Sequence, residues 1–453
     1  MGGARATLDL GIENGTLVRS TGSFSGHVYI AGGRIAAVAA QPLPARERID
    51  ARGLLVMPGM VDAHVHFMDP GDPSREDFPT ASAAAARAGV TTVIEHTHAR
   101  PVRSAAELEV KRARLEDRSL VDFALAAHAW PDRVDDIERV VSAGAAFVKA
   151  FTCTTHGIPG LRAADLDAVL TRLADSPVPC LVHAEDESFT EQAERRLRAA
   201  GRDDPGVILE WRSRAAEEAA IATVGQLARR NRARVVIAHV SGLGALAEIM
   251  RAREAGAPLI AETCPQYLTL LESEVLERAA FRKFTPPARA AGTDDLDRMW
   301  EALSDGRLDY IATDHAPSTP AQKRAGSIWD VHFGLPGIDT TLPVLLDAVH
   351  GGRLTYERVV ELYSERPAEV YGLQPRKGRL EIGADADIVV VDPTQRWTVS
   401  DDDIRSRAGW SPFAGRTLVG RAVRTYVRGG LVADGNEVVG PPGWGRFIPG
   451  AGA

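Results

Sequence analysis

The middle of the chain alternates between strand-like and helix-like segments, and this alternation limits the possible folds more than any other feature. Apolar, strand-like runs recur from residue 58 to residue 374, and helical patterns such as 81–88 and 105–117 lie between most of them. Eight strand–helix units of this kind predict a closed parallel (β/α)8 TIM barrel, with an open doubly wound sheet as the alternative. The predicted strands are residues 60–67, 90–97, 121–129, 147–152, 179–185, 234–240, 259–264 and 310–316.

Both ends of the chain have a different texture, in which short alternating strands are separated by glycine turns. Asn14-Gly15 is a hairpin turn signal near the start, and 386–391 is typical of a buried strand near the end. We therefore expect one small β-sandwich domain from residues 1–57 and 375–453, attached to a barrel domain of residues 58–374. The Gly/Pro-rich tail 441–453 is expected to extend over the surface.

Composition narrows the classes of partner. The 453 residues carry a net charge of -8 with acidic and basic residues interleaved, which disfavours nucleic acid and anionic membrane surfaces as partners. No apolar run approaches the roughly 20 residues of a membrane span. The three cysteines are scattered and form no C-x-x-C pair, which favours a reducing, cytoplasmic location. A small-molecule partner is the class that remains.

The first predicted strand carries two histidines, His64 and His66, two residues apart. A strand repeats every two residues, so both imidazoles point to the same side. Such a rigidly aimed pair suits a metal ion, although an isolated pair can also be incidental in a strand.

Reactive side chains also lie at the ends of four later predicted strands. Lys149 stands in an apolar run, and each of the other three strands ends near His183, His239 or Asp314. Alone, either histidine could be a hydrogen-bonded core residue. Asp314 could cap a loop, and Lys149 could pair with a carboxylate. In a barrel, however, the carboxyl ends of all strands meet at one mouth, so the coincidence favours a zinc-type site of imidazoles and carboxylate.

The motif around His64 and His66 resembles the amidohydrolase superfamily, in the cyclic-amide group of hydantoinases, dihydropyrimidinases, allantoinases and dihydroorotases. The later residues Lys149, His183, His239 and Asp314 match the same family in their order along the chain. The resemblance runs from 30–35 through 383–388 to 411–415. It implies a TIM barrel with a β-sandwich, a hydrolase that opens cyclic amides, and a homo-oligomer, either a tetramer or a dimer. The motif reads Pro58-Gly59-Met60-Val61-Asp62-Ala63-His64-Val65-His66-Phe67.

The resemblance also implies two divalent metal ions per subunit, with zinc as the expected metal. The first ion would be held by His64, His66 and Asp314. The second would be held by His183 and His239. Non-catalytic relatives on the same scaffold have lost metal ligands, whereas this chain keeps every ligand position, which favours an enzyme over an interaction scaffold.

Lys149 and Asp314 have further implied roles. The resemblance makes Lys149 an N6-carboxylysine, whose carbon dioxide-derived carbamate bridges both metals and explains a lysine within an apolar strand. A metal-bridging hydroxide would attack the cyclic amide carbon. Asp314 would take the proton of that hydroxide and deliver it to the departing ring nitrogen.

The identity of the ring is less constrained. Dihydroorotases resembling this chain carry an arginine where Met68 stands and an asparagine where His98 stands, so both positions count against dihydroorotate. Dihydropyrimidinases and D-selective hydantoinases place an oxyanion-donating tyrosine shortly after the lysine, and 151–156 has none. The stretch 149–153 is closer to allantoinases and L-selective hydantoinases. Allantoin or a 5-substituted hydantoin is therefore favoured, and a dihydropyrimidine, a cyclic imide or dihydroorotate are the alternatives.

Loops 68–79 and 152–160 are expected to frame the substrate. Arg75 could supply a polar contact or be solvated, and Thr154, Thr155 or His156 could replace the missing tyrosine as a donor. The main chain of 286–287 and 334–337 could read the imide edge of the ring or simply form turns. Cys153 and Cys264 are expected to be small core residues. The expected substrate contacts are His98, Thr154, Thr155, Pro287, Gly334 and Gly337.

Overall fold

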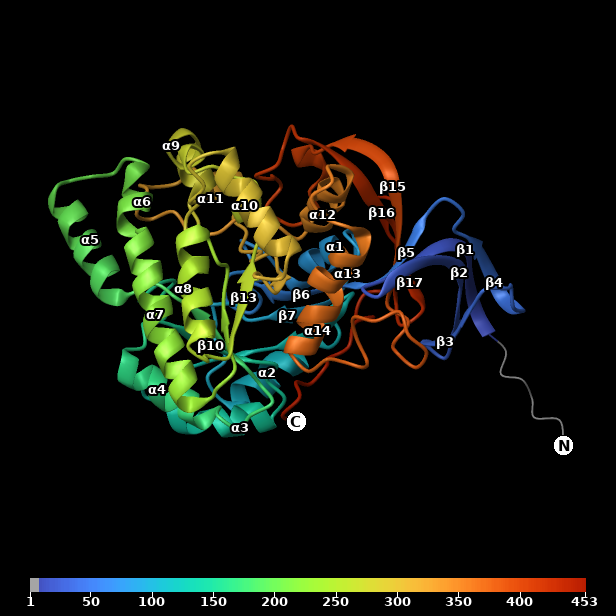
Figure 1. Cartoon of the computed structure of the whole chain (residues 1–453), viewed down its shortest axis with the longest axis horizontal. Coiled ribbons are helices and arrows are strands. Elements are labelled where there is room, and N and C mark those ends of the chain that lie inside the picture. Colours follow the sequence, from blue (N-terminus) through green and yellow to red (C-terminus); the bar gives the residue numbers. More distant parts are fainter. Residues whose placement is uncertain (1–7) are drawn as a thin grey trace.

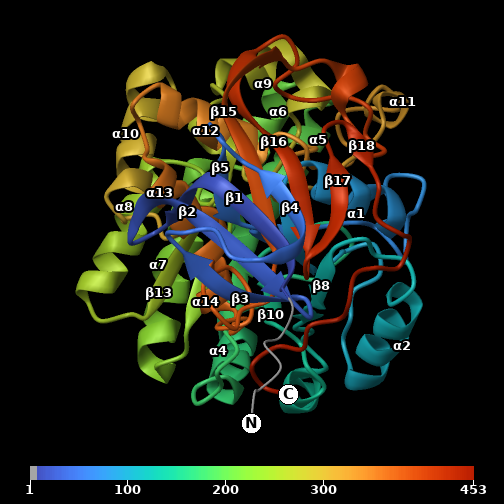
Figure 2. The ribbon, with the colours of Figure 1, turned by 90° about the vertical axis from the view of Figure 1, so that its right-hand side faces the viewer.

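The computed structural model describes residues 8–453, and these form an α/β barrel flanked by a β-sheet (Figure 1). Turned by 90°, the molecule shows strands from both ends of the chain side by side in front of the barrel (Figure 2). The part of the expected β-sandwich that falls on residues 1–7 lies outside the described residues.

The barrel is closed, as the strand–helix alternation predicts. Every neighbouring pair that the ladders record between its strands is parallel, and β9 (Ala127–His128) continues β8 to pair with β10. A parallel bridge between Val65 and His315 joins the first strand to the segment after the last. The barrel strands in the described residues are β6 (Met60–Val65), β7 (Val90–Glu95), β8 (Asp122–Leu125), β10 (Val148–Phe151), β11 (Cys180–His183), β12 (Val235–Ile237), β13 (Leu259–Thr263) and β14 (Tyr310–Ile311).

Helices cover the outside of the barrel, and several begin at residues suited to capping. Asp77, Ser104 and Ser213 each accept a hydrogen bond from a backbone N–H of the first turn of α1, α2 and α7. No helix within residues 8–453 is long and apolar enough to cross a membrane. The helices are α1 (Phe78–Arg87), α2 (Ala105–Leu115), α3 (Ile137–Ser142), α4 (Ala163–Arg172), α5 (Glu187–Ala199), α6 (Gly206–Trp211), α7 (Arg214–Asn231), α8 (Leu243–Glu254), α9 (Ser273–Arg278), α10 (Thr293–Ser304), α11 (Pro320–Lys323), α12 (Thr341–His350), α13 (Tyr356–Val360) and α14 (Arg366–Val370).

The flanking sheet joins the two ends of the chain. Its order is β18-β17-β16-β15-β5-β1-β2-β3, with β4 also paired to β1, and the antiparallel β15–β5 ladder connects the late strands to the early ones. Ile12, Val28, Val56, Ile388 and Val390 are among the residues of its separate apolar core. The strands are β1 (Leu8–Arg19), β2 (Gly22–Ala31), β3 (Arg34–Ala39), β4 (Ala45–Asp50), β5 (Leu55–Pro58), β15 (Ile388–Thr398), β16 (Thr417–Val427), β17 (Gly430–Asp434) and β18 (Glu437–Val438).

The hairpin expected at Asn14-Gly15 is wrong. These residues lie inside β1, where the register with β2 shifts between Ile12 and Gly15, and the chain reverses only after Arg19. Asn14 has a φ of 62°, which serves a β-bulge as well as a turn. A Cβ on Gly15 would lie 2.6 Å from Val56 Cγ2, so the glycine permits close packing there.

The tail 441–453 is attached to the barrel more closely than its composition suggests. Phe447 forms a parallel bridge with Phe123 of β8, and Ile448 is buried. The backbone N–H of Gly445 donates to Ser119 O at 2.8 Å, and a Cβ at Gly445 would collide with Val121 O. Glycine therefore lets the tail backbone pack against the barrel, so the tail does more than extend over the surface.

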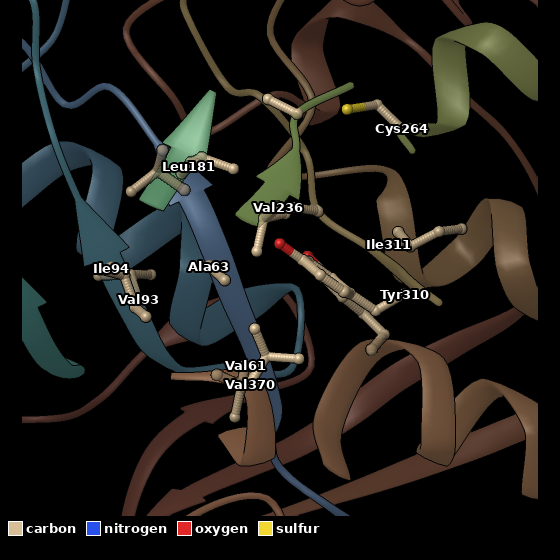
Figure 3. Packing of buried hydrophobic residues seen from close by; sticks show 14 of the residues in the cluster. Val61, Ala63, Val93, Ile94, Leu181, Val236, Cys264, Tyr310, Ile311 and Val370 are labelled. Atoms are coloured by element: carbon tan, nitrogen blue, oxygen red, sulfur yellow. The ribbon is translucent and has the colours of Figure 1, made fainter. Parts of the chain in front are cut away.

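The barrel interior combines apolar packing with a polar layer beneath the mouth. Figure 3 shows part of the apolar packing, including Val61 and Ala63 on β6 and Tyr310 on β14. The Tyr310 hydroxyl lies 2.7 Å from Glu262 Oε2 and 2.6 Å from the Tyr371 hydroxyl. This layer supports the side chains that stand above it.

Candidate active site

One cavity at the carboxyl ends of the barrel strands brings together all the side chains that the sequence proposes as metal ligands. They come from five different strands, in agreement with the expectation that strand ends converge on one mouth. The lining residues are His64, His66, His98, Lys149, Phe151, His156, His183, His239, Thr285, Asp314, Ala316, Phe333 and Gly334.

Asp314 lies between His64 of β6 and His66, which directly follows that strand. Its Oδ1 lies 3.1 Å from His64 Nε2 and 3.3 Å from His66 Nε2. Burial alone would raise the Asp314 pKa, but the His64 charge and hydrogen bonds from both imidazoles outweigh it and hold the pKa well below its usual range. The lowered pKa favours the ionised carboxylate, and a single oxygen of that carboxylate lies close to two imidazole nitrogens.

His183 and His239 form a second pair. His183 Nδ1 lies 2.9 Å from His239 Nε2, and His183 Nε2 lies 2.8 Å from Glu185 Oε2. Because a carboxylate accepts hydrogen bonds, Glu185 favours the tautomer with hydrogen on Nε2 and leaves the Nδ1 lone pair facing His239. Two facing nitrogens at this distance can share a proton or hold a common cation.

Two buried glutamates orient these histidines. Glu262 Oε1 lies 2.6 Å from His64 Nδ1, so this carboxylate holds the ring with its other nitrogen, Nε2, facing Asp314. Glu185 also accepts from Thr285 Oγ1 at 2.6 Å and from Arg212 Nη1 at 3.3 Å. Carboxylates that fix imidazole tautomers in this way are typical of metal centres.

The charges of these groups follow from the same contacts. Burial would raise the Glu185 pKa, but Arg212 and the hydrogen bonds lower it to about 2. Burial would lower the His64 pKa, but Glu262 and Asp314 raise it to about 8.

Lys149 is buried at the bottom of the cavity, and its Nζ has no hydrogen-bond partner among the residues that the structure describes. Burial lowers its pKa to about 8. His66 Nδ1 and His239 Nδ1 are also buried without a partner in the described part of the chain. Buried polar atoms are normally satisfied, so these nitrogens fit a centre that would hold cations.

The backbone is strained around the mouth. Asp314 and His239 have φ values of 49° and 40°, and the cavity-lining His156 and nearby Met68 have 55° and 56°. Positive φ is uncommon for residues other than glycine and concentrates at functional sites. The backbone conformation therefore gives a second reason, besides the kinds of residue present, to regard the cavity as a functional site.

The predicted substrate contacts divide into two groups. His98 and Gly334 line the cavity, whereas Thr154, Thr155, Pro287 and Gly337 are not among its lining residues in the described structure. Thr154 is exposed on its loop. All six roles stay predictions.

Around His98 the cavity wall is built from rings. His98 stacks on His156 with ring centroids 4.2 Å apart, and the Arg75 Nη1 lies 3.5 Å from His98 Nε2. Arg75 itself is buried and donates to Pro317 O at 2.9 Å. The loop 68–79 therefore reaches the mouth through His98.

Sequence reasoning missed four polar residues at this end of the barrel. His96 follows β7 and precedes His98 by two residues, a repeat of the His64–His66 spacing that could have identified it. His128 is the last residue of β9, so it also stands at the end of a barrel strand. Glu185 stands two residues after His183, on the same side of the chain. Glu262 lies in the apolar run of β13 and offered no signal beyond being a carboxylate in a buried strand.

The cysteines behave as core residues. Cys153, Cys180 and Cys264 are buried, and burial raises the pKa of Cys153 and Cys180 to about 12. Cys153 Sγ accepts a hydrogen bond from Arg212 Nη1 at 3.1 Å. Thiols of this kind are poor nucleophiles.

The fold and the cavity define a barrel protein with candidate metal-binding groups at its mouth. A family model described as the amidohydrolase family matches residues 55–432, and the chain belongs to this family. Members of the family are metal-dependent, and the histidine and aspartate groups of the mouth are candidate metal ligands.

Curated relatives and a solved structure match nearly the whole chain. An allantoinase from Rubrobacter xylanophilus is 36% identical over 98% of each chain, and an L-hydantoinase from Paenarthrobacter aurescens is 32% identical over 97% of this chain and 98% of that one. The solved L-hydantoinase (dihydropyrimidinase) from Arthrobacter aurescens has a TM-score of 0.93 and 31% identity, and covers 98% of this chain and 100% of that one.

Proposed function

We propose that this protein hydrolyses the ring amide of a hydantoin-like substrate, such as allantoin or a 5-substituted hydantoin. The observation that carries the proposal is the convergence of His64, His66, Lys149, His183, His239 and Asp314 on one cavity. The allantoinase and L-hydantoinase names of the relatives support the ring class.

Two divalent cations, zinc being the proposed metal, fit the two pairs of facing groups. His64, His66 and Asp314 would hold one ion, and His183 with His239 would hold the other. When bound, such ions polarise a carbonyl group and lower the pKa of bound water toward neutrality.

Lys149 would be carboxylated on Nζ. Its lowered pKa leaves more of the neutral amine, which is the form that attacks carbon dioxide and releases a proton to give the carbamate. An anionic carbamate would also remove the cost of an isolated buried ammonium group. His66 and Lys149 line the same cavity, and each has a buried nitrogen without a partner among the described residues, which supports this arrangement.

Asp314 is the proposed proton carrier. Its Oδ1 stands at the mouth between two imidazole nitrogens, 3.1 Å from His64 Nε2 and 3.3 Å from His66 Nε2. It would accept a proton from the water and deliver it to that nitrogen. Glu185 and Glu262 hold the imidazoles so that this geometry is set before substrate arrives.

The cavity wall is suited to a small planar ring. Phe151 and Phe333 supply apolar faces, while His98, His156 and the main chain of Gly334 supply polar groups. Such a mixture of apolar walls and a few polar groups is typical of small-molecule sites.

A dihydroorotase activity is the second candidate, because a dihydroorotase from Halobacterium salinarum is 36% identical over 84% of this chain and 87% of that one. Met68 in place of an arginine argues against it. We further propose a homotetrameric or dimeric cytoplasmic enzyme with domain boundaries near residues 58 and 374. Sedimentation velocity tests the oligomeric state.

A substrate panel tests the function. Purified protein with zinc and bicarbonate is followed for ring opening of allantoin, hydantoin, 5-benzylhydantoin, dihydrouracil, succinimide and dihydroorotate. We expect the highest kcat/KM with allantoin or a 5-substituted hydantoin, and loss of that activity in an Asp314→Asn control. Equal rates in that control, or no opening of any ring, contradict the proposal.

A further inference from the structure

The second barrel strand repeats the histidine spacing of the first. His64 lies near the end of β6 and His66 directly follows it, and His96 and His98 follow β7, which lies beside β6 in the barrel. The backbone N–H of His96 donates to Val65 O at 3.2 Å, which sets His96 at the level between His64 and His66. In adjacent parallel strands, side chains at the same level on the same face are neighbours.

His96 packs against both histidines of the first pair. Its ring centroid lies 4.5 Å from that of His64 and 4.4 Å from that of His66. One ring nitrogen from each of these three residues lies within 4.8 Å of the others, a spacing that a single metal ion can bridge.

Both ring nitrogens of His96 lack a hydrogen-bond partner within the described residues, although the side chain is fully buried. A neutral imidazole normally has its N–H donor and its acceptor nitrogen satisfied when buried. The neighbouring rings of Phe147 and His66 pack against His96 without forming a recorded hydrogen bond to it. Within the described residues, His96 therefore keeps a nitrogen lone pair that is available to a metal ion.

We propose that His96 is a third imidazole ligand of the metal ion that His64 and His66 would hold. This inference rests on the proposed function and adds a residue to its centre. The added ligand is neutral, so it increases coordination without changing the charge that Asp314 balances.

A third nitrogen donor alters metal preference. Imidazole suits cobalt, nickel and zinc, whereas manganese favours carboxylate, carbonyl and water oxygens. With His96 the first centre would therefore discriminate more strongly for cobalt over manganese than a centre with two imidazoles.

His128 provides a matched control. It is also buried with both ring nitrogens unpartnered in the described structure, but its ring centroid lies 6.1 Å from that of His96 and it is absent from the group of close nitrogens. Removing it deletes the same chemical group from the same end of the barrel.

The experiment measures binding of metal alone. Metal-free wild type, His96→Leu and His128→Leu are titrated with cobalt and with manganese against a chromophoric chelator, in the presence of bicarbonate. We expect His96→Leu to weaken cobalt binding at the first centre by at least about tenfold and manganese binding by less, with His128→Leu within about threefold of wild type. Thermal melts of the metal-free proteins establish folding, and His96→Asn replaces His96→Leu if the latter does not fold.

A cobalt anomalous-difference map of wild-type crystals tests the same point without substitution. A His96 nitrogen within about 2.3 Å of the first cobalt supports the inference. Two bound cobalt ions with His96 turned away, or cobalt affinity in His96→Leu equal to that of the His128 control, overturns it and leaves the proposed function standing. A wild-type protein that binds no cobalt overturns both.

Discussion

Two buried lysines of this protein have opposite surroundings. Lys377 Nζ contacts three carboxylates, with Asp387 at 2.7 Å, Asp385 at 2.9 Å and Asp122 of β8 closest. Lys149, equally buried, has no hydrogen-bond partner in residues 8–453 and faces a cavity. The charge of Lys377 is balanced by carboxylates, whereas Lys149 Nζ has no such contact among the described residues.

The comparison separates charged residues that stabilise the fold from those that serve the candidate site. Asp122, Asp385 and Asp387 lie close enough together to suggest a cation site, but the Lys377 ammonium and the Arg428 guanidinium already occupy it. This network joins the barrel to the flanking sheet, because Asp122 belongs to β8 and Asp387 directly precedes β15. At the mouth, the unsatisfied nitrogens instead point to a centre completed by other groups.

Replacement of Lys149 by alanine tests the functional side and has the largest expected effect. Losing the bridging group should release metal and lower kcat/KM by about 10⁴-fold or more, roughly 5 kcal/mol of transition-state stabilisation. Metal analysis and steady-state kinetics measure both. Partial rescue by short carboxylic acids is expected, and full metal content without rescue would sink the carbamate hypothesis.

Asp314→Asn keeps the shape of the mouth and removes the proposed proton carrier. We expect kcat to fall by about 10²–10⁴-fold, the usual contribution of general acid–base catalysis, while part of the metal is retained. Initial rates and metal content on the same sample check this. Turnover close to wild type would show that another group moves the proton.

Lys377→Met tests the structural side of the comparison. Three buried carboxylates would lose their shared cation, and we expect the free energy of unfolding to fall by about 3–5 kcal/mol. Urea unfolding measures this loss, and kcat/KM of the protein that remains folded should stay within a few fold of wild type. A loss of activity without a loss of stability would contradict the division between the two lysines.

Glu185→Gln has the smallest expected effect, because it keeps the shape of a residue that orients His183 without touching the cation itself. The amide can turn an N–H toward His183 Nε2 and favour the wrong tautomer. We expect metal affinity to fall by about 10–100-fold, measured by chelator competition. An unchanged affinity would show that His183 is held by its packing alone.

Much of this architecture could be predicted from sequence, because regularly spaced apolar runs indicate regular strands and helices. All of the barrel strands fall within the apolar runs expected for them, and His64, His66, Lys149, His183, His239 and Asp314 meet at one mouth. Strand periodicity and the parallel topology suffice for this, since both act through the backbone.

The rest depended on tertiary contacts that a sequence pattern does not contain. Asn14-Gly15 has the same local signal for a bulge as for a hairpin, and pairing with β2 decides between them. Glu262 becomes significant only because β13 places it under His64. The spacing of His96 to His98 repeats that of the first strand, but only the fold shows that the His96 ring packs against His64 and His66.

Diffraction from wild-type crystals grown with zinc and bicarbonate tests the central claim most directly. The account predicts two anomalous peaks at the zinc edge, one beside His64, His66 and Asp314 and one between His183 and His239. It also predicts a carboxylate group attached to Lys149 Nζ between the peaks. A mouth with no zinc peak and a bare Lys149 amine would contradict the account.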